Sequence, residues 1–322
     1  MLLAGDLGGT KTHLGLFAPA SPRPRLVAAQ EYATLAFEDL PSMISEFLEA
    51  HAATASAVTA ACIGVAGPVH GEAADMTNVP WRVDARAVRT GVGLARVTLI
   101  NDVEALVHAV PLLEPGELAT LHDAVPDPHG NAGVITVGTG FGQGFLHRVN
   151  GRVVPLPSEG GHADFPARTP RELELVAWLA ARHHRVDVER VVSGRGLANV
   201  AEFVHDGTCP VAGDDGDPDL PAAISRAALE GRCGRCREAL DLVVGALGAA
   251  AGNAAILAVA RAGVFIGGGI PAKILAALQG PVFREAYLDK APLDDLVAAI
   301  PVYAVLHPAA GLLGAAACAQ GG

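Results

Sequence analysis

The chain has 322 residues, a net charge of −11, a hydrophobic content of 51% and only 4% aromatic residues. This length is typical of about two domains, whose cores must be built from Ala, Val, Leu and Ile. The negative charge excludes nucleic acid as an expected partner, because proteins bind its phosphates mainly through Lys and Arg.

The chain begins with a short apolar strand at residues 2–4, followed by a glycine-rich turn with the sequence GDLGGTKT at residues 5–12. Lys11 follows Thr10 rather than a glycine, so the turn does not fit the GxxxxGK[ST] pattern, after which a helix begins. Instead, residues 13–17 alternate apolar with polar or small residues, which is the period of a β-strand. The turn is therefore predicted to be the tip of a β-hairpin.

Strands and helices alternate in the next hundred residues. We predict strands at residues 26–31, 60–65 and 97–100, and a helix at 41–52 whose apolar residues share one face. This alternation predicts an α/β layered fold.

Two polar residues, Asn101 and Asp102, follow the apolar strand at 97–100. The carboxyl end of a buried strand is where α/β sheets place ligands. A carboxylate there could accept a proton from an alcohol as the alcohol attacks phosphorus. Alternatively, either residue could cap a helix expected at 103–110. The dipeptide alone does not decide between the two roles.

A second glycine-rich turn, TVGTGFGQG, occupies residues 136–144. It does not fit the dinucleotide-binding pattern GxGxxG, because residue 143 is Gln. We expect another β-hairpin, so both parts of the chain begin their sheets alike, a weak sign of internal duplication.

Two such turns suit a protein that binds a triphosphate from both sides, because glycine lets backbone N–H groups approach oxygens closely. Thr10 and Thr139 would add hydroxyl donors; two ordinary hairpins without a ligand are the alternative.

Polar side chains that could bind a hydroxylated ligand come next. The turn SEGGHAD at residues 158–164 places Glu159 and His162 three residues apart, which allows them to bind two neighbouring hydroxyls. Glu189 precedes a further glycine-containing segment, RVVSG. A solvated loop and an ordinary exposed carboxylate are the alternatives.

The last part of the chain returns to alternating helices and strands. We expect an exposed loop at residues 206–221, helices at 222–230 and 239–260, a strand at 264–266, a helix at 272–278, a strand at 302–306 and a helix at 311–319. Residues 242–259 are the longest apolar stretch, but Asn253 and many Ala and Gly residues indicate a buried helix, and we expect no membrane partner. Gly267, Gly268 and Gly269 could present a flat backbone to an adenine ring or simply join strand to helix.

The chain has five cysteines, and its first residues lack the basic segment of a signal peptide, so we expect a reducing, cytoplasmic location. Cys233 and Cys236 form a single CxxC motif. Zinc needs two more ligands at a fitting spacing. None lies nearby in the sequence, so we expect an ordinary surface loop here rather than a metal or redox site.

Seven motifs, in order along nearly the whole chain, resemble those of the bacterial ATP-dependent glucokinase family, part of the hexokinase and actin-like ATPase superfamily. They are GDLGGT at 5–10, LIND at 99–102, SEGGH at 158–162, ERVVSG at 189–194, GAAAGN at 248–253, VFIGGGI at 264–270 and GLLG at 311–314. The resemblance implies an α/β fold of two actin-like (ribonuclease H-like) domains around a cleft. The small domain would comprise residues 1–108 and 308–322, and the large domain residues 109–307.

The resemblance also implies roles for individual residues. The implied nucleotide contacts are Gly5, Asp6, Leu7, Gly8, Gly9, Thr10, Gly138, Thr139, Gly140, Gly268 and Gly269, with Asp6 holding Mg²⁺ through water. The implied sugar contacts are Asn78, Asn101, Asp102, Glu159, His162 and Glu189, with Asp102 as the catalytic base. The implied activity is transfer of the γ-phosphoryl group of ATP to the 6-hydroxyl of glucose, by a cytoplasmic homodimer.

The chain departs from the family pattern in two places. Relatives usually carry Gly-Pro before the second glycine-rich turn, where this chain has Thr136 and Val137. Related ROK sugar kinases carry a zinc-binding cysteine cluster soon after their Glu-x-Gly-His motif. This chain has no cysteine between Glu159 and Cys209, so we expect no structural zinc.

Other functions remain alternatives. The same scaffold could phosphorylate another hexose or an N-acetylhexosamine, and the donor could be ADP or polyphosphate. A sugar-sensing regulator needs a DNA-reading domain, which we do not expect because the first strand begins at residue 2. An actin-like filament subunit would not need Glu159, His162 and Glu189.

Overall fold

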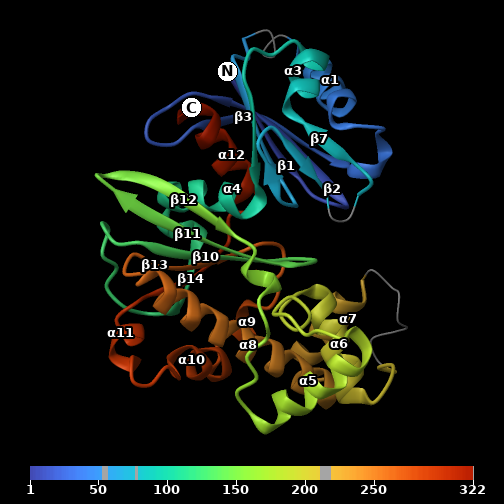
Figure 1. Ribbon diagram of the computed structural model, residues 1–322, viewed down its shortest axis with the longest axis vertical. Helices are drawn as coiled ribbons and strands as arrows, with labels where there is room; N and C mark the ends of the chain where they lie inside the picture. The colour runs from blue at the N-terminus through green and yellow to red at the C-terminus, as the bar shows by residue number, and fades with distance from the viewer. Residues whose placement is uncertain (53–56, 77–78, 211–218, 322) are drawn as a thin grey trace. The chain divides into compact units, whose positions relative to one another are not determined.

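A computed structural model describes residues 1–52, 57–76, 79–210 and 219–321 (Figure 1). The chain divides into two compact units. The first comprises Met1–Glu114 together with His307–Gly322, and the second comprises Pro115–Leu306. Each unit contains one large β-sheet with helices packed on it.

The sheet of the first unit has the strand order β3-β2-β1-β4-β8. Its strands are β1 (Leu2–Leu7), β2 (Lys11–Ala18), β3 (Arg25–Ala33), β4 (Ala60–Val65) and β8 (Val97–Asn101). β1, β2 and β3 are antiparallel neighbours, whereas β4 and β8 run parallel to β1. All five strands were predicted from the sequence. A small sheet of β5 (Val69–His70), β6 (Ala73–Asp75) and β7 (Arg82–Asp84) was not.

Helices cover both faces of this sheet, and β1 shows why. Leu3 and Leu7 belong to an apolar cluster that includes Phe47 of α1 (Leu40–Ala50). The alternate residues Leu2 and Ala4 belong to a second cluster with α12 (Ala310–Gly321). Figure 1 shows α12, the last helix of the chain, beside the strands of the first unit, and it also packs on α4 (Asp102–Ala109). The helix α3 (Ala85–Val92) packs on α1.

The sheet of the second unit has the strand order β12-β11-β10-β13-β14-β9. Its strands are β9 (Leu118–His122), β10 (Ala132–Val137), β11 (Phe141–Val149), β12 (Arg152–Ser158), β13 (Gly263–Gly267) and β14 (Val302–Val305). β10, β11 and β12 are antiparallel, and β13 and β14 run parallel to β10. Five strands thus repeat the order and directions of the first sheet, a duplication that the sequence indicated only at the two hairpins.

The central helix of the second unit is α8 (Gly234–Ala258), on which α6 (Gly194–His205), α7 (Leu220–Leu229), α9 (Leu275–Leu278), α10 (Pro281–Leu288) and α11 (Asp294–Ala298) pack. The helix α5 (Pro170–His183) packs on α6. α8 is the one helix among the described residues that is long and apolar enough to cross a membrane, but 67% of its apolar window is buried inside the protein. This is the buried helix that the sequence predicted.

Two predictions for this unit need correction. The helix predicted at 272–278 is wrong at its start, because residues 271–274 form turns and only Leu275–Leu278 is helical. The predicted loop at 206–221 overlaps the start of α7, and Cys209 within it is only 5% exposed. Residues 211–218 of this loop lie outside the described part of the chain.

The packing of α12 on α4 can be tested by substituting Gly314. A Cβ on Gly314 would overlap the backbone carbonyl oxygen of Ala105 in α4. Gly314→Ala should therefore lower the free energy of unfolding by about 1–3 kcal/mol, because overpacking forces backbone to move. Urea unfolding would measure the change. Gly321→Ala, in the same helix but with no described atom within 4 Å, is the control and should be neutral or slightly stabilising. Equal losses in both variants would contradict this interpretation of the contact.

Candidate functional site

The parallel strands of the first unit bring several predicted site residues to one edge of its sheet. β1, β4 and β8 are in register, so that Leu7 pairs with Val65, which in turn pairs with Asn101. Asp6 accordingly lies two strand spacings from Ile100, roughly 10 Å. The first glycine-rich turn and the Asn101–Asp102 pair therefore share the carboxyl edge of the sheet.

The first glycine-rich turn is the tip of the β1–β2 hairpin, as predicted. Gly5, Asp6 and Leu7 belong to β1, while Gly8, Gly9 and Thr10 form the turn that leads into β2. Two hydrogen bonds from Thr34 hold this turn in place. The Thr34 hydroxyl donates to the Gly8 carbonyl at 2.8 Å, and the Thr34 N–H donates to the Thr10 carbonyl at 3.0 Å. The Thr34 hydroxyl also lies 2.9 Å from that of Thr12. The glycine spacing did not reveal Thr34, because Thr34 follows β3 and lies 26 positions from Gly8 in the sequence.

Asp6 lies where β1 meets the first turn of α12. Its Oδ2 atom is 2.7 Å from the position that a Cβ on Gly311 would occupy, so only glycine leaves room for the carboxylate. Burial raises the pKa of Asp6, and the neighbouring His13 on β2 partly offsets this by lowering it. The Asp6 carboxylate thus lies close to Gly311, beside the first glycine-rich turn.

Asn101 and Asp102 have different local roles. Asn101 is the N-cap of α4, because its Oδ1 accepts the Val103 N–H at 2.8 Å and its Nδ2 donates to the Gly67 carbonyl at 3.1 Å. Asp102 is the first residue of α4, and its Oδ1 also accepts the Val103 N–H, at 2.9 Å. A helix N-terminus favours a negative charge, so the first turn of α4 is a favourable position for the Asp102 side chain. The capping alternative is confirmed for Asn101.

The second glycine-rich turn is likewise a hairpin tip, between β10 and β11. The Gly138 N–H donates to the Gly140 carbonyl at 2.9 Å, and Thr139 between them is exposed. The Gly194 N–H, at the start of α6, donates to the Gly138 carbonyl at 2.8 Å. The N-terminus of α6 therefore holds this turn in place.

Gly268 and Gly269 both lie near the second glycine-rich turn, but their surroundings differ. Gly268 has a φ of +98°, and a Cβ there would overlap the backbone of Val137 at the base of the second turn. Gly269 has no described atom within 4 Å of its Cβ position and is exposed. Gly268 therefore supports the turn, while Gly269 presents open backbone beside it.

The fold brings Glu159, His162 and Glu189 together at the second glycine-rich turn. The Glu189 N–H donates to the Gly161 carbonyl at 3.0 Å, and Oε2 of Glu189 accepts the Phe141 N–H at 2.9 Å. Glu159 and His162 are exposed, while Glu189 is half-buried. Three segments that are far apart in the sequence thus form one polar surface in the second unit.

Asp187 is a further member of this surface that the sequence analysis missed. Its Oδ2 lies 3.3 Å from Nδ1 of His162. A carboxylate accepts hydrogen bonds, so Nδ1 of His162 is the donor in this contact. Asp187 therefore sets the orientation of His162. No spacing motif marks Asp187, because it contacts a residue 25 positions away.

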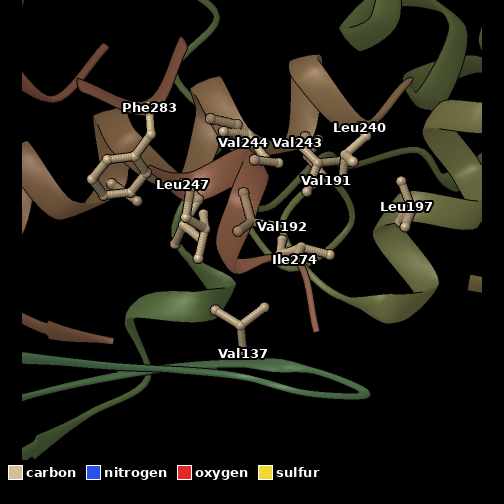
Figure 2. Close-up of a cluster of buried hydrophobic side chains, with 14 of the residues drawn as sticks. Val137, Val191, Val192, Leu197, Leu240, Val243, Val244, Leu247, Ile274 and Phe283 are labelled. Carbon is tan, nitrogen blue, oxygen red and sulfur yellow. The ribbon is translucent and has the colours of Figure 1, made fainter. Parts of the chain in front are cut away.

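The core fixes the position of Glu189. Val191 and Val192, which follow it, are 1% and 0% exposed. Figure 2 shows both side chains in an apolar cluster with Val137 and the α8 residue Val244. Because these valines are buried, the Glu189 carboxylate is held where the strand β11 begins.

Two predictions about individual residues turn out differently. Asn78 lies outside the described residues. The expectation that Cys233 and Cys236 lack nearby partners is wrong, because His205 and Cys209 lie within 4.8 Å of both. The cysteines are not in a surface loop either, since Cys233 caps α8 and Cys236 lies buried in its first turn.

The amino-acid sequence matches the family model described as Glucokinase over residues 3–321. Glucokinase from Nostoc punctiforme is 36% identical over 338 residues, which cover 99% of this chain and 98% of the relative. This chain belongs to the glucokinase family. The resemblance inferred from the seven motifs is thereby confirmed.

Solved structures of glucokinases share the fold. A glucokinase from an Antarctic psychrotroph has a TM-score of 0.86 and 28% identity, with 100% of this chain and 99% of that one covered. A ROK family glucokinase from Streptomyces griseus, solved with glucose and AMPPNP, has a TM-score of 0.69 and 22% identity, covering 100% and 99% of the two chains. The predicted α/β fold of actin-like domains is confirmed by these glucokinases.

The hydrogen bond from Phe141 to Glu189 can be tested by comparing two variants of this glucokinase-family chain. Glu189→Ala leaves the Phe141 N–H without its acceptor and should lower the free energy of unfolding by about 1–3 kcal/mol. Glu189→Gln retains an amide oxygen and should cost at most about 1 kcal/mol. Denaturant unfolding of both variants measures the difference. If Gln destabilises as much as Ala, the hydrogen bond does not hold the segment.

Proposed function

We propose that this chain transfers the γ-phosphoryl group of ATP to the 6-hydroxyl of glucose, giving glucose 6-phosphate and ADP. The single observation that carries the proposal is the glucokinase family match over residues 3–321. The complex of the Streptomyces griseus glucokinase with glucose and AMPPNP supports the choice of both substrates.

In this proposal the two glycine-rich turns bind the phosphates of ATP. The exposed residues Thr10 and Thr139 supply hydroxyl donors, and backbone N–H groups of the turns add to them. Gly268 and Gly269 contribute backbone to the nucleotide site. Phosphoryl transfer has a loose transition state, so these groups act by alignment and by stabilising charge rather than by covalent chemistry.

Asp6 fits a hydrated Mg²⁺, because hard cations take oxygen ligands and this half-buried residue lies beside the first glycine-rich turn. When bound with ATP, the ion supplies neutralising charge to the phosphates. The protein's own part is to hold the Asp6 carboxylate in place through the close approach of Gly311.

The sugar is assigned to the polar side chains of both sheets. Asp102 accepts the proton of the attacking hydroxyl, and Asn101 and Asn78 contribute further contacts. Glu159, His162 and Glu189 bind the other hydroxyls, with His162 oriented by Asp187. Such paired contacts select a substrate, because an analogue that lacks a hydroxyl leaves a buried polar group unpaired.

The experiment that tests this function is sugar-dependent ADP release. Glucose, fructose, mannose and N-acetylglucosamine should be compared with ATP as the donor, and then ATP with ADP and polyphosphate for glucose. We expect glucose and ATP to give the highest kcat/KM. A higher value for another sugar would favour a sister hexose kinase, and no turnover with any sugar would favour a sensor.

Asp102→Asn tests the catalytic base. Turnover should fall by roughly 10²–10⁴-fold while glucose binding is retained, because a positioned base contributes about that factor. Steady-state kinetics and calorimetric titration with glucose give the two quantities. Asp39→Asn is the control, since Asp39 is an exposed N-cap in the same unit and Asn caps equally well. Near-normal turnover of Asp102→Asn would remove Asp102 from this role.

Glu159→Ala tests the sugar site of the second unit. Because the Glu159 side chain is exposed, its removal should leave stability unchanged. Glucose affinity should fall at least about tenfold, the loss of one charged hydrogen bond, while ATP affinity is nearly unchanged. Equal losses for both ligands would instead assign Glu159 a structural role.

Assembly and location also belong to this proposal. We propose a homodimer in the cytoplasm, as the resemblance to bacterial glucokinases implies. Analytical ultracentrifugation of the purified chain would test the dimer.

A further inference from the structure

Four metal-ligand side chains converge at one end of helices α6 and α8. His205, Cys209, Cys233 and Cys236 each offer one ligand atom, and these atoms all lie within 4.8 Å of one another. Sγ of Cys209 lies 3.3 Å from Sγ of Cys236, and Nε2 of His205 lies 3.6 Å from Sγ of Cys236 and 3.8 Å from Sγ of Cys233. His205, Cys209 and Cys236 are at most 8% exposed.

Two of these distances, 3.6 and 3.8 Å, match the edges of a tetrahedral zinc site, and the 3.3 Å between Sγ of Cys209 and Sγ of Cys236 is slightly shorter. Zinc binds sulfur at about 2.3 Å and imidazole nitrogen at about 2.0–2.1 Å, which places neighbouring ligand atoms roughly 3.6–3.8 Å apart. A disulfide would instead bring two sulfurs to about 2.05 Å. At 3.3 Å the sulfurs of Cys209 and Cys236 are not bonded to each other, and the four ligand atoms form one compact group.

We propose that His205, Cys209, Cys233 and Cys236 bind one Zn²⁺ ion as a closed structural site. Three thiolates and one imidazole are ligands that select zinc over hard cations such as Mg²⁺. All four positions are taken by protein, so no coordination position is left for a substrate. The site is separate from the glycine-rich turns and makes no use of the proposed kinase reaction.

The local structure supports metal ligation at each pair of ligands. Cys233 and Cys236 stand at the N-terminus of α8, where the Cys236 N–H donates to Sγ of Cys233 at 3.4 Å. A thiolate is the better acceptor for that N–H and is favoured by the helix N-terminus. His205 is the last residue of α6, and Cys209 follows it by four positions.

The charge around the site is also balanced. Zn²⁺ with three thiolates and a neutral imidazole carries a net charge of −1. Arg235 lies between the two α8 cysteines, and its Nη1 donates to the His205 carbonyl at 3.0 Å. A guanidinium is thus held beside the excess negative charge, which lowers the cost of burying the thiolates.

The metal would tie together helices that support the phosphate-binding region. α6 ends at His205, and its other end holds Gly138 of the second glycine-rich turn through the Gly194 N–H. α8 carries Val243, Val244 and Leu247 into the core around Val192 (Figure 2). Zinc would therefore fix the ends of both helices and stabilise the second unit.

The first experiment measures metal in the full-length protein, purified under reducing conditions from zinc-supplemented cells without metal-affinity resin. Elemental analysis should give one zinc per chain. Cys209→Ser and Cys236→Ser should each lower the zinc content at least about tenfold, because each removes one thiolate from the coordination sphere. Cys318→Ser, which alters a cysteine in the first unit, is the matched control and should keep the full zinc content.

A second measurement does not depend on variants that may fail to fold. Replacement of zinc by Co²⁺ in the unaltered chain should give the strong absorption of tetrahedral cobalt bound to thiolates. Removing zinc with a chelator should lower the melting temperature by several degrees, and Zn²⁺ but not Mg²⁺ should restore it.

The proposal is overturned if the unaltered protein neither contains zinc nor binds Zn²⁺ or Co²⁺ after reduction. It is also overturned if Cys318→Ser loses as much zinc as Cys209→Ser, or if mass spectrometry finds Cys209 and Cys236 joined as a disulfide in the freshly purified protein. Because zinc content is measured without substrates, these outcomes leave the proposed glucose phosphorylation unaffected.

Discussion

The parallel pairing of β1, β4 and β8 is the constraint on which the candidate site of the first unit depends. It aligns the ends of three strands, so that a glycine-rich turn, a carboxylate and a helix N-terminus occur at one edge. Gly64 in the middle strand and Gly314 in α12 let α4 and α12 pack tightly behind that edge. The chemistry assigned to Asp6 and Asp102 needs this alignment, because neither side chain reaches far by itself.

The second unit positions its glycine-rich turn with the same strand order, but different contacts hold the turn in place. Its glycine-rich turn is held by the start of α6 and by the backbone packing of Gly268 against Val137. The valines after Glu189 are buried, so an exposed polar surface rests on a rigid apolar core. A kinase that works by alignment rather than covalent chemistry requires this kind of rigid support for its polar groups. The zinc proposed at the far end of α6 would add to it.

The sequence predicted those features whose signals are local. Clustered glycines indicated both hairpins, an apolar alternation supported the first, and strand β4 was predicted with its observed ends. Features that depend on contacts between distant residues were not predicted from the sequence. Examples are the hydrogen bond from Thr34 to the first glycine-rich turn and the contact between Asp187 and His162. The proposed zinc ligands were not predicted for the same reason. His205 and Cys233 are 28 positions apart and come together only when α6 packs on α8. One missed helix, α5, did carry a local signal, the capping box of Thr169 and Glu172 with a proline between them.

In the proposed reaction, one particular alcohol of the sugar, the 6-hydroxyl, attacks the γ-phosphoryl group of the nucleotide. The most direct measurement is ³¹P NMR of the product formed from glucose and ATP, with 6-deoxyglucose as the comparison. The account predicts a single phosphomonoester on the 6-oxygen, formed together with ADP, and no product from 6-deoxyglucose. A phosphate on another hydroxyl, or ADP release that does not depend on glucose, would contradict it.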